Sequence, residues 1–171
     1  MRQLRKQEVK KLIQKVEKRD QEIYLILENI QYARNVASIF RTADAAAVRR
    51  IYLTGITQQP PFGKDLQKTS RHKENSVEWM YKETTGEVIQ TLKKQGFFII
   101  AIELADEAAR IDQLKDLIKT HPKICFVAGS EVFGVTKNTL EKADKAVYIP
   151  MYGHTGSLNV STAVGIVLFS F

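Results

Sequence analysis

The 171-residue sequence lacks several features that would place a protein outside the cytoplasm. Its one cysteine, Cys125, cannot form an internal disulfide, which favours a reducing compartment. No apolar run approaches the ~20 residues that a membrane-spanning helix needs. The charged N-terminus has no apolar segment behind it, unlike a secretory signal. We therefore expect a cytoplasmic protein that does not interact with a membrane.

Motifs of common enzyme classes are also missing. The chain has no G-x-G-x-x-G after its first expected strand, no G-x-x-x-x-G-K-[ST] and no G-x-S-x-G, so dinucleotide, P-loop and α/β-hydrolase sites are not supported. The histidines His72, His121 and His154 show no metal-ligand spacing with cysteines or acids, so we expect no metal. Cys125 lies inside the apolar run KICFVA, where a core residue is expected rather than a nucleophile.

Basic residues are abundant, with a formal net charge of +7 and a pI near 9.5. This balance favours a polyanionic partner, most simply nucleic acid, although many basic proteins bind none. One basic cluster lies in residues 1–20. We refer to the second as the 64–73 cluster; its members are Lys64, Lys68, Arg71, His72 and Lys73.

Apolar periodicity predicts two parts of unequal size. Val9, Leu12, Ile13 and Val16 recur at helical spacing, so residues 1–21 are expected to form a basic amphipathic helix that packs by one stripe. Residues 22–171 alternate between strands and helices, which predicts one α/β domain with a mainly parallel sheet and helices on both faces. The expected strands are 22–27, 50–53, 97–104, 123–128 and 147–149, and the expected helices lie within 29–47, 87–94, 111–119, 137–143 and 158–171.

The segments that follow the expected strands are candidate ligand sites, because ligands of parallel sheets bind at the carboxyl ends of the strands. These segments are 29–35, 55–76, 103–106, 129–134 and 150–159. The last two are rich in glycine and small polar residues. Residues 54–76 have no regular pattern and are expected to be mostly irregular, as functional loops often are.

Three stretches together resemble the motifs of one enzyme family. NIQYARNVASIFRTADAAAV (29–48), FVAGSEVFGV (126–135) and IPMYGHTGSLNVSTAVGI (149–166) resemble motifs 1, 2 and 3 of the SpoU-type RNA 2′-O-ribose methyltransferases of the SPOUT superfamily. Their order and spacing match, and the resemblance covers nearly all of the chain from Glu22 onward. The resemblance implies S-adenosylmethionine as cofactor and tRNA or rRNA as substrate.

The same resemblance implies a fold and a set of cofactor contacts. The C-terminal segment would be threaded through a loop to make a deep trefoil knot, and the protein would be a homodimer whose contact involves Val164 and Leu168. Ile149 and Leu158 would flank the adenine. The implied cofactor-binding residues are Ile102, Gly129, Gly134, Ile149, Pro150, Met151, Ser157 and Leu158.

Catalytic roles follow from the same resemblance. Arg41 of motif 1 would act at the ribose hydroxyl, and Asn35 would position Arg41 or the partner subunit. Glu131 could hold Arg41 or the loop backbone, while Ser157 and Asn159 would supply a hydroxyl and an amide. The residues also allow plainer interpretations: an arginine in an alanine-rich helix is often a surface ion-pair partner, and Ser157 and Asn159 also suit a helix N-cap.

Departures from the family pattern keep a second function open. Val132 stands where family members usually have glycine, and they also usually have a glycine near Ala47. Val132 would weaken cofactor binding if its backbone needed glycine's freedom. The alternative is then an RNA-binding protein on the same fold with weak or lost catalysis. In either case the expected RNA contacts are Arg41, Lys64, Lys68, Arg71 and Lys73.

Overall fold

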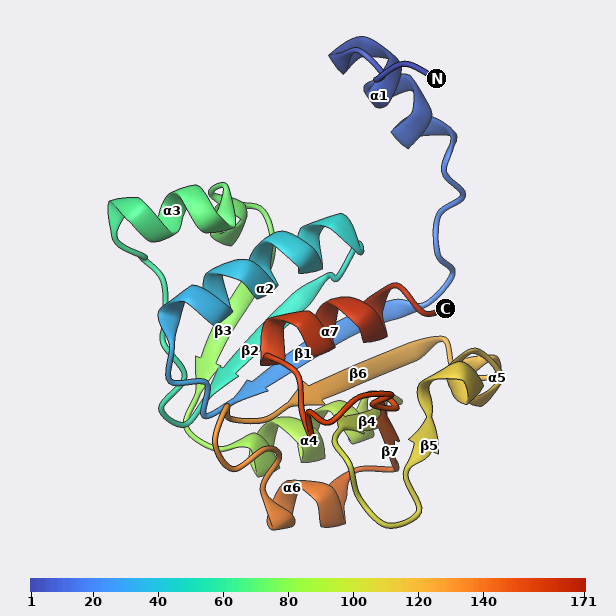
Figure 1. Ribbon diagram of the computed structural model, residues 1–171. Coiled ribbons are helices and arrows are strands. Elements are labelled where there is room, and N and C mark those ends of the chain that lie inside the picture. Colours follow the sequence, from blue (N-terminus) through green and yellow to red (C-terminus); the bar gives the residue numbers. More distant parts are fainter.

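The computed structural model describes the backbone of residues 1–171 and all side chains except those of Lys64 and Asp65. Its centre is a seven-stranded sheet in the order β3-β2-β1-β6-β4-β7-β5, with parallel pairing throughout (Figure 1). The prediction of one α/β domain with a mainly parallel sheet is confirmed. The strands are β1 (Glu22–Glu28), β2 (Arg50–Thr54), β3 (Glu78–Lys82), β4 (Phe98–Ile102), β5 (Ala109–Arg110), β6 (Lys123–Ala128) and β7 (Lys145–Tyr148).

Helices cover both faces of the sheet (Figure 1). On one face α2 packs against α7 and α3, and on the other α4 packs against α6. The helices are α1 (Lys6–Lys15), α2 (Ala33–Ala45), α3 (Lys64–Ser70), α4 (Thr85–Lys94), α5 (Leu114–Ile118), α6 (Lys137–Lys142) and α7 (Val160–Leu168), with 3-10 turns η1 (Lys73–Asn75) and η2 (Ile111–Gln113).

The core has two layers because side chains alternate across a strand. Leu25 and Leu27 of β1 join the layer under α2 and α7, whereas Tyr24 and Ile26 join the layer under α4. Cys125 is fully buried in the second layer, and this burial raises the pKa of its thiol well above its ordinary value. The expectation of a core cysteine is confirmed.

The stretch 54–76 is more regular than predicted. It contains α3 and η1, and the edge strand β3 follows it. The strand β3 has the sequence EWMYK and is exposed or half-buried along its length, so it lacks the apolar pattern from which the other strands were predicted. The two-residue strand β5 is also absent from the prediction, since so short a strand carries no periodicity.

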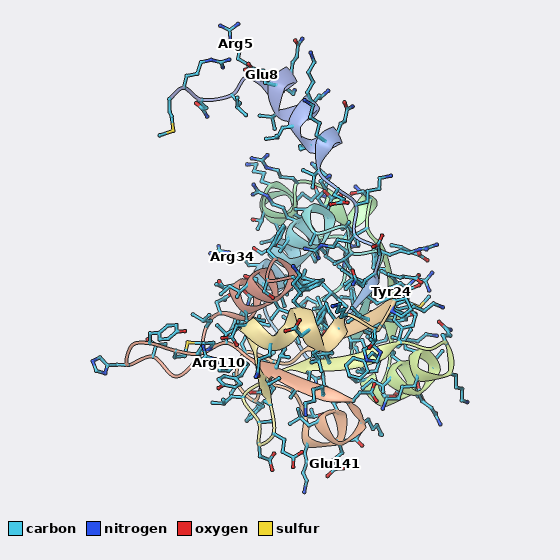
Figure 2. The ribbon with its side chains drawn as sticks, turned by 90° about the vertical axis from the view of Figure 1, so that its right-hand side faces the viewer. Arg5, Glu8, Tyr24, Arg34, Arg110 and Glu141 are labelled. Atoms are coloured by element: carbon cyan, nitrogen blue, oxygen red, sulfur yellow. The ribbon has the colours of Figure 1, made fainter. Side chains whose placement is uncertain are left out.

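The helix α1 covers only Lys6–Lys15 of the predicted 1–21 segment, and it does not pack on the domain. None of its residues is buried, and its apolar stripe of Val9, Leu12 and Ile13, with Val16 just beyond, is exposed. Both ribbon views show α1 standing clear of the domain (Figures 1 and 2). The prediction that it docks by one stripe is wrong for this single chain, because no apolar surface of the domain reaches it.

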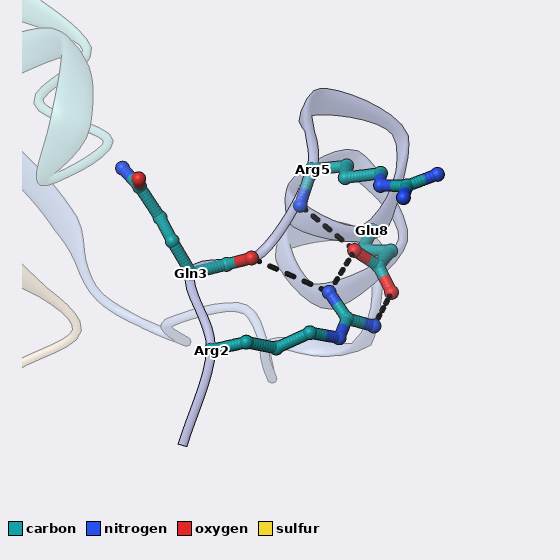
Figure 3. A network of polar contacts seen from close by, with 4 residues as sticks. All are labelled: Arg2, Gln3, Arg5 and Glu8. Carbon is teal, nitrogen blue, oxygen red and sulfur yellow. Dashed lines mark hydrogen bonds and ion pairs between the residues drawn. The ribbon is translucent and has the colours of Figure 1, made fainter.

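Local contacts at the N-terminus hold the first turn of α1 (Figure 3). The Glu8 carboxylate accepts bonds from both terminal nitrogens of Arg2, at 2.9 and 2.6 Å, and from the backbone N–H of Arg5 at 2.7 Å. The pKa of Glu8 is lowered, first by Arg2 and then by this backbone bond. Arg2 and Arg5 are exposed, and all of these contacts lie within residues 2–8, so they organise the turn rather than anchor the helix to the domain.

The linker of residues 16–21, between α1 and β1, contacts the end of α7. The guanidinium of Arg19 donates to the carbonyl of Leu168 and lies 4.5 Å from the ring centre of Phe171. A cation suits this place because the carbonyl end of a helix carries partial negative charge. In the described part of the chain, no helix has both the length and the apolar character needed to cross a membrane.

Candidate cofactor pocket and catalytic site

A cavity of about 620 Å³ lies where β4, β6 and β7 end and α7 begins. Its walls come from the segments after those three strands, as expected for a parallel sheet. Every residue that the family resemblance assigned to the cofactor lines this cavity. These residues are Ile102, Gly129, Gly134, Ile149, Pro150, Met151, Ser157 and Leu158.

Two glycines shape the wall of the cavity. A Cβ atom on Gly129 would overlap the backbone of Gly134 and Val135, and one on Gly134 would overlap the carboxylate of Glu103. Gly134 also has a φ of +65°, which favours glycine. Backbone hydrogen bonds between Ser130 and Gly134, both 3.0 Å, close the turn. The motif 2 loop therefore presents its main chain to the cavity because it lacks side chains at these two positions.

One buried amide connects all three motifs. The Asn35 Nδ2 of motif 1 donates to the Glu131 Oε1 of motif 2 at 2.7 Å. The Oδ1 of Asn35 accepts from the Asn159 Nδ2 of motif 3 at 3.0 Å. Glu131 and Asn159 line the cavity, while Asn35 lies behind them on α2 with only 9% of its surface exposed. Asn35 thus fixes the relative position of two cavity walls.

Glu131 also holds the loop that precedes α2. Its carboxylate accepts the backbone N–H groups of Gln31 at 3.0 Å and Tyr32 at 3.3 Å. Burial favours a higher pKa for Glu131, but the hydrogen bonds from Asn35, Gln31 and Tyr32 outweigh burial, and the pKa is lowered. Of the two expected roles, contact with the loop backbone is the one that Glu131 makes among the contacts described.

Asn159 also caps α7. Its Oδ1 accepts from the backbone N–H of Ser161 at 2.9 Å and from the Ser161 hydroxyl at 2.6 Å. The plainer interpretation of Asn159 as an N-cap is therefore correct, and the same side chain also reaches Asn35 through its amide nitrogen. Ser157 lies two residues earlier, exposed on the cavity wall.

Arg41 does not join this group. It lies six residues after Asn35 on α2, is exposed, and is not among the residues that line the cavity. Arg34, seven residues before Arg41 and so on nearly the same side of the helix, is exposed too (Figure 2). Arg41 is thus placed to contact another molecule rather than the cavity wall.

The 64–73 cluster adjoins α2, because α3 and η1 both pack against that helix. The side chain of Lys64 lies outside the described residues. Arg71 is exposed and has a left-handed backbone with a φ of +52° at the end of α3. Lys73 forms a 2.8 Å ion pair with Asp44 of α2, and Lys68 also has an interaction partner. The predicted RNA contacts are therefore near Arg41, but two of the lysines already have partners.

The two departures from the family pattern differ in consequence. Val132 is 65% exposed and does not have a positive φ, so its position does not require glycine. Ala47 has a φ of +57° just after α2, where glycine would be unstrained. The argument for lost cofactor binding rested on Val132, and its exposed, unstrained position removes that argument.

The predicted dimer contact needs correction. Val164 and Leu168 are fully buried in the core of the single chain, packed with α2 and the sheet, and so cannot meet a partner. The apolar side chains that α7 and its end expose are Ile166 and Phe169. The error arose because helical periodicity identifies an apolar face but does not say which partner covers it.

Sequence reasoning missed Glu103, which lines the cavity beside Ile102. Its carboxylate accepts the backbone N–H of Val135 at 2.9 Å and that of Leu104 at 2.9 Å. Its place in 103–106, one of the candidate ligand segments, was the available signal. Among the residues described, no three His, Cys, Asp or Glu side chains are grouped closely enough to bind a metal.

Comparisons with known proteins agree with this site. Residues 22–169 match the model of the SpoU rRNA Methylase family. A tRNA (guanosine(18)-2′-O)-methyltransferase from Aquifex aeolicus is 32% identical over 164 residues, covering 94% of this chain and 74% of that protein. The enzyme of the same name from Escherichia coli K12 is 30% identical, covering 89% of this chain and 63% of that protein.

The fold of this chain also matches solved structures of related enzymes. The A. aeolicus TrmH/SpoU tRNA modifying enzyme superimposes with a TM-score of 0.76 at 29% identity, covering 96% of this chain and 80% of that chain. An AdoMet-bound rRNA methyltransferase from Sinorhizobium meliloti gives 0.79 at 26% identity, covering 91% of this chain and 57% of that chain. The chain therefore belongs to the SpoU rRNA methylase family, as its three motifs predicted.

Proposed function

We propose that this chain transfers a methyl group from S-adenosylmethionine to a ribose 2′-hydroxyl of tRNA or rRNA. The observation that carries the proposal is the Asn35–Glu131–Asn159 network, which joins the three motifs at one cavity. The A. aeolicus and E. coli relatives, at 32% and 30% identity, are named as tRNA 2′-O-methyltransferases, and an rRNA methyltransferase of this fold has been solved with AdoMet.

The residues of the cavity fit this cofactor. Apolar side chains of Ile102, Ile149 and Leu158 offer surfaces for an adenine ring. Gly129 and Gly134 bring the backbone to the wall, and main-chain groups can then serve as hydrogen-bond partners. The cavity volume lies within the range of ordinary small-molecule sites, about 300–1,000 Å³. S-adenosylmethionine supplies the methyl group as a sulfonium.

The protein's own part in the reaction is mainly orientation. A ribose hydroxyl is a poor nucleophile at neutral pH, so holding it in line with the methyl group supplies much of the rate. The guanidinium of an arginine is a planar fork of N–H donors, so Arg41 can hold a phosphate and a hydroxyl together. Its exposed place on α2 suits a residue that meets RNA. Ser157 and Asn159 at the start of α7 would hold the loop that faces the reacting groups.

RNA would bind across α2 and the neighbouring 64–73 cluster. The net charge of +7 favours a polyanion, and Arg41 and Arg71 are exposed on adjoining elements. The basic α1 stands free of the domain and could contribute further contacts. Binding to cellular RNA, together with one buried cysteine, agrees with a location in the cytoplasm.

Two architectural features belong to the same proposal. We infer a C-terminal trefoil knot, because the resemblance of the three motifs to the SpoU family implies one and the chain belongs to that family. We infer a homodimer, because Phe133 and Leu104 at the cavity and Phe169 after α7 are large apolar side chains exposed in the single chain. Apolar exposure of this kind commonly marks a protein interface.

The test uses purified full-length protein with S-adenosylmethionine and separate pools of unmodified tRNA and rRNA. We expect methyl incorporation into one pool, at a nucleotide that becomes resistant to alkaline cleavage on its 3′ side. Gly129→Ala is the matched negative variant. Cofactor and RNA binding without any methyl incorporation would instead support the RNA-binding alternative.

A further inference from the structure

Glu103 lines the cavity at the end of β4. It follows β4, which lies between β6 and β7 in the sheet, and the segments after β6 and β7 form the two main walls. Its backbone N–H continues the ladder by donating to the carbonyl of Val147 at 3.0 Å. The side chain is therefore fixed at its root and lies between the motif 2 and motif 3 loops.

The carboxylate of Glu103 is held in place but not saturated. Oε2 accepts from the N–H of Val135 and Oε1 from the N–H of Leu104, so each oxygen has one described hydrogen bond. A carboxylate offers about four acceptor positions. Gly134 lies close to the same carboxylate, so close that a Cβ atom at this position would overlap it. Glu103 thus keeps acceptor capacity in a fixed orientation on the cavity wall.

The other carboxylate of the lining differs in this respect. Glu131 accepts three donors, from Gln31, Tyr32 and Asn35, and all three belong to α2 or the loop before it. Its hydrogen bonds are therefore directed at protein groups outside the cavity lining. Of the two carboxylates that line the cavity, Glu103 is the one with more capacity for a ligand.

A vicinal diol matches this acceptor. The ribose of an adenosine cofactor offers two adjacent O–H donors, and a carboxylate at the end of a parallel strand accepts from ribose hydroxyls in dinucleotide-binding folds. The neighbours Ile102 and Leu104 are apolar, which suits a neutral sugar next to an adenine better than a second charge. We propose that Glu103 accepts hydrogen bonds from the ribose hydroxyls of S-adenosylmethionine and so selects the ribo form of the cofactor.

This inference rests on the proposed function, and its test uses binding rather than turnover. Isothermal titration calorimetry would measure the dissociation constants of S-adenosylhomocysteine, methylthioadenosine, and the 2′-deoxy and 3′-deoxy forms of each. The proteins compared are wild type, Glu103→Gln and Asp106→Asn. Asp106 is an exposed carboxylate of the same loop outside the cavity lining and serves as the control. Methylthioadenosine lacks the amino-acid group, so it separates a diol contact from an ammonium contact.

For wild type and Asp106→Asn we expect removal of a contacted hydroxyl to weaken binding by about tenfold to a hundredfold, as for a hydrogen bond to a charged group. For Glu103→Gln the ribo forms should bind about tenfold more weakly, and the deoxy penalty should shrink to about threefold or less.

Three results would overturn the inference. The first is a deoxy penalty that is the same in Glu103→Gln as in wild type. The second is a Glu103→Gln variant that binds S-adenosylhomocysteine more weakly than wild type but binds methylthioadenosine equally well. That result would assign Glu103 to the ammonium group. The third, which needs no variant and so holds even if Glu103→Gln fails to fold, is equal wild-type affinity for ribo and deoxy forms. If wild type binds none of these ligands, the proposed function itself fails.

Discussion

Replacing Asn35 with alanine should lower the free energy of unfolding, because its buried side-chain amide makes a hydrogen bond through both its nitrogen and its oxygen. The change removes a 2.7 Å hydrogen bond to the Glu131 carboxylate and a 3.0 Å bond from Asn159. A bond to a charged group contributes about 1.5–3 kcal/mol and a neutral one about 0.5–1.5 kcal/mol. Glu131 is only partly buried, so we expect the lower end of the summed range, about 2 kcal/mol. That corresponds to a fall in Tm of about 4–8 °C.

The pH dependence of this cost gives a sharper test. The lowered pKa of Glu131 means that its contribution to stability is present above the unfolded pKa, near 4.5, and is lost as the pH falls through the lower folded pKa. Asn35 supplies the largest of the hydrogen bonds that lower this pKa. Asn35→Ala therefore raises the folded pKa toward the unfolded value, and its cost should be greatest near pH 7 and shrink below about pH 4.

Urea denaturation at these two pH values measures the free energy of unfolding. Asn138→Ala is the matched control, because Asn138 is exposed on α6 and its only described partner is Lys142, at 2.7 Å. The control should change stability by no more than about 0.5 kcal/mol. An Asn35→Ala cost as small as the control's, or one that stays constant between the two pH values, would refute the view that Asn35 holds the ionised Glu131.

Further predictions address the cofactor, catalysis, RNA and strain. Gly129→Ala should lose S-adenosylmethionine binding by titration while circular dichroism stays near wild type, because the added Cβ would displace the turn behind it; undiminished binding would remove Gly129 from the pocket. Arg41→Ala should bind the cofactor nearly normally, yet its rate of methyl transfer should fall by about 10²–10⁴-fold. Arg41→Lys should transfer methyl groups almost as slowly, if the planar fork of arginine matters. Full activity of Arg41→Ala would show that Arg41 is only a surface residue. Arg71→Ala should lower the slope of log affinity against log salt by about 0.7–0.9, and an unchanged slope would show that Arg71 is merely solvated. Ala47→Gly should raise the free energy of unfolding by about 0.5–1 kcal/mol, because its φ of +57° strains alanine more than glycine's extra chain entropy costs; a loss of stability in thermal unfolding would contradict this.

Much of this protein could be predicted from its sequence. Long apolar runs such as KICFVA predicted the central strands, since a strand buried on both faces has few other compositions open to it. Of the eight residues predicted to bind the cofactor, seven lie in the three motifs and Ile102 lies outside them, and all eight line one cavity. Local patterns succeeded here because the contacts concerned lie within a strand, or in the loop that directly follows it.

Only the tertiary structure decided how distant residues meet. Helical periodicity marked Val9 and Val164 alike as apolar, yet Val9 stays exposed on a free helix while Val164 is buried under α2. The links from Asn35 to Glu131 and to Asn159 span 96 and 124 residues of sequence, and they depend on which strands are neighbours. The sequence shows that a helix face is apolar or that a loop is polar. Which segment packs against that face or loop depends on strand order and loop packing, and these involve the whole chain.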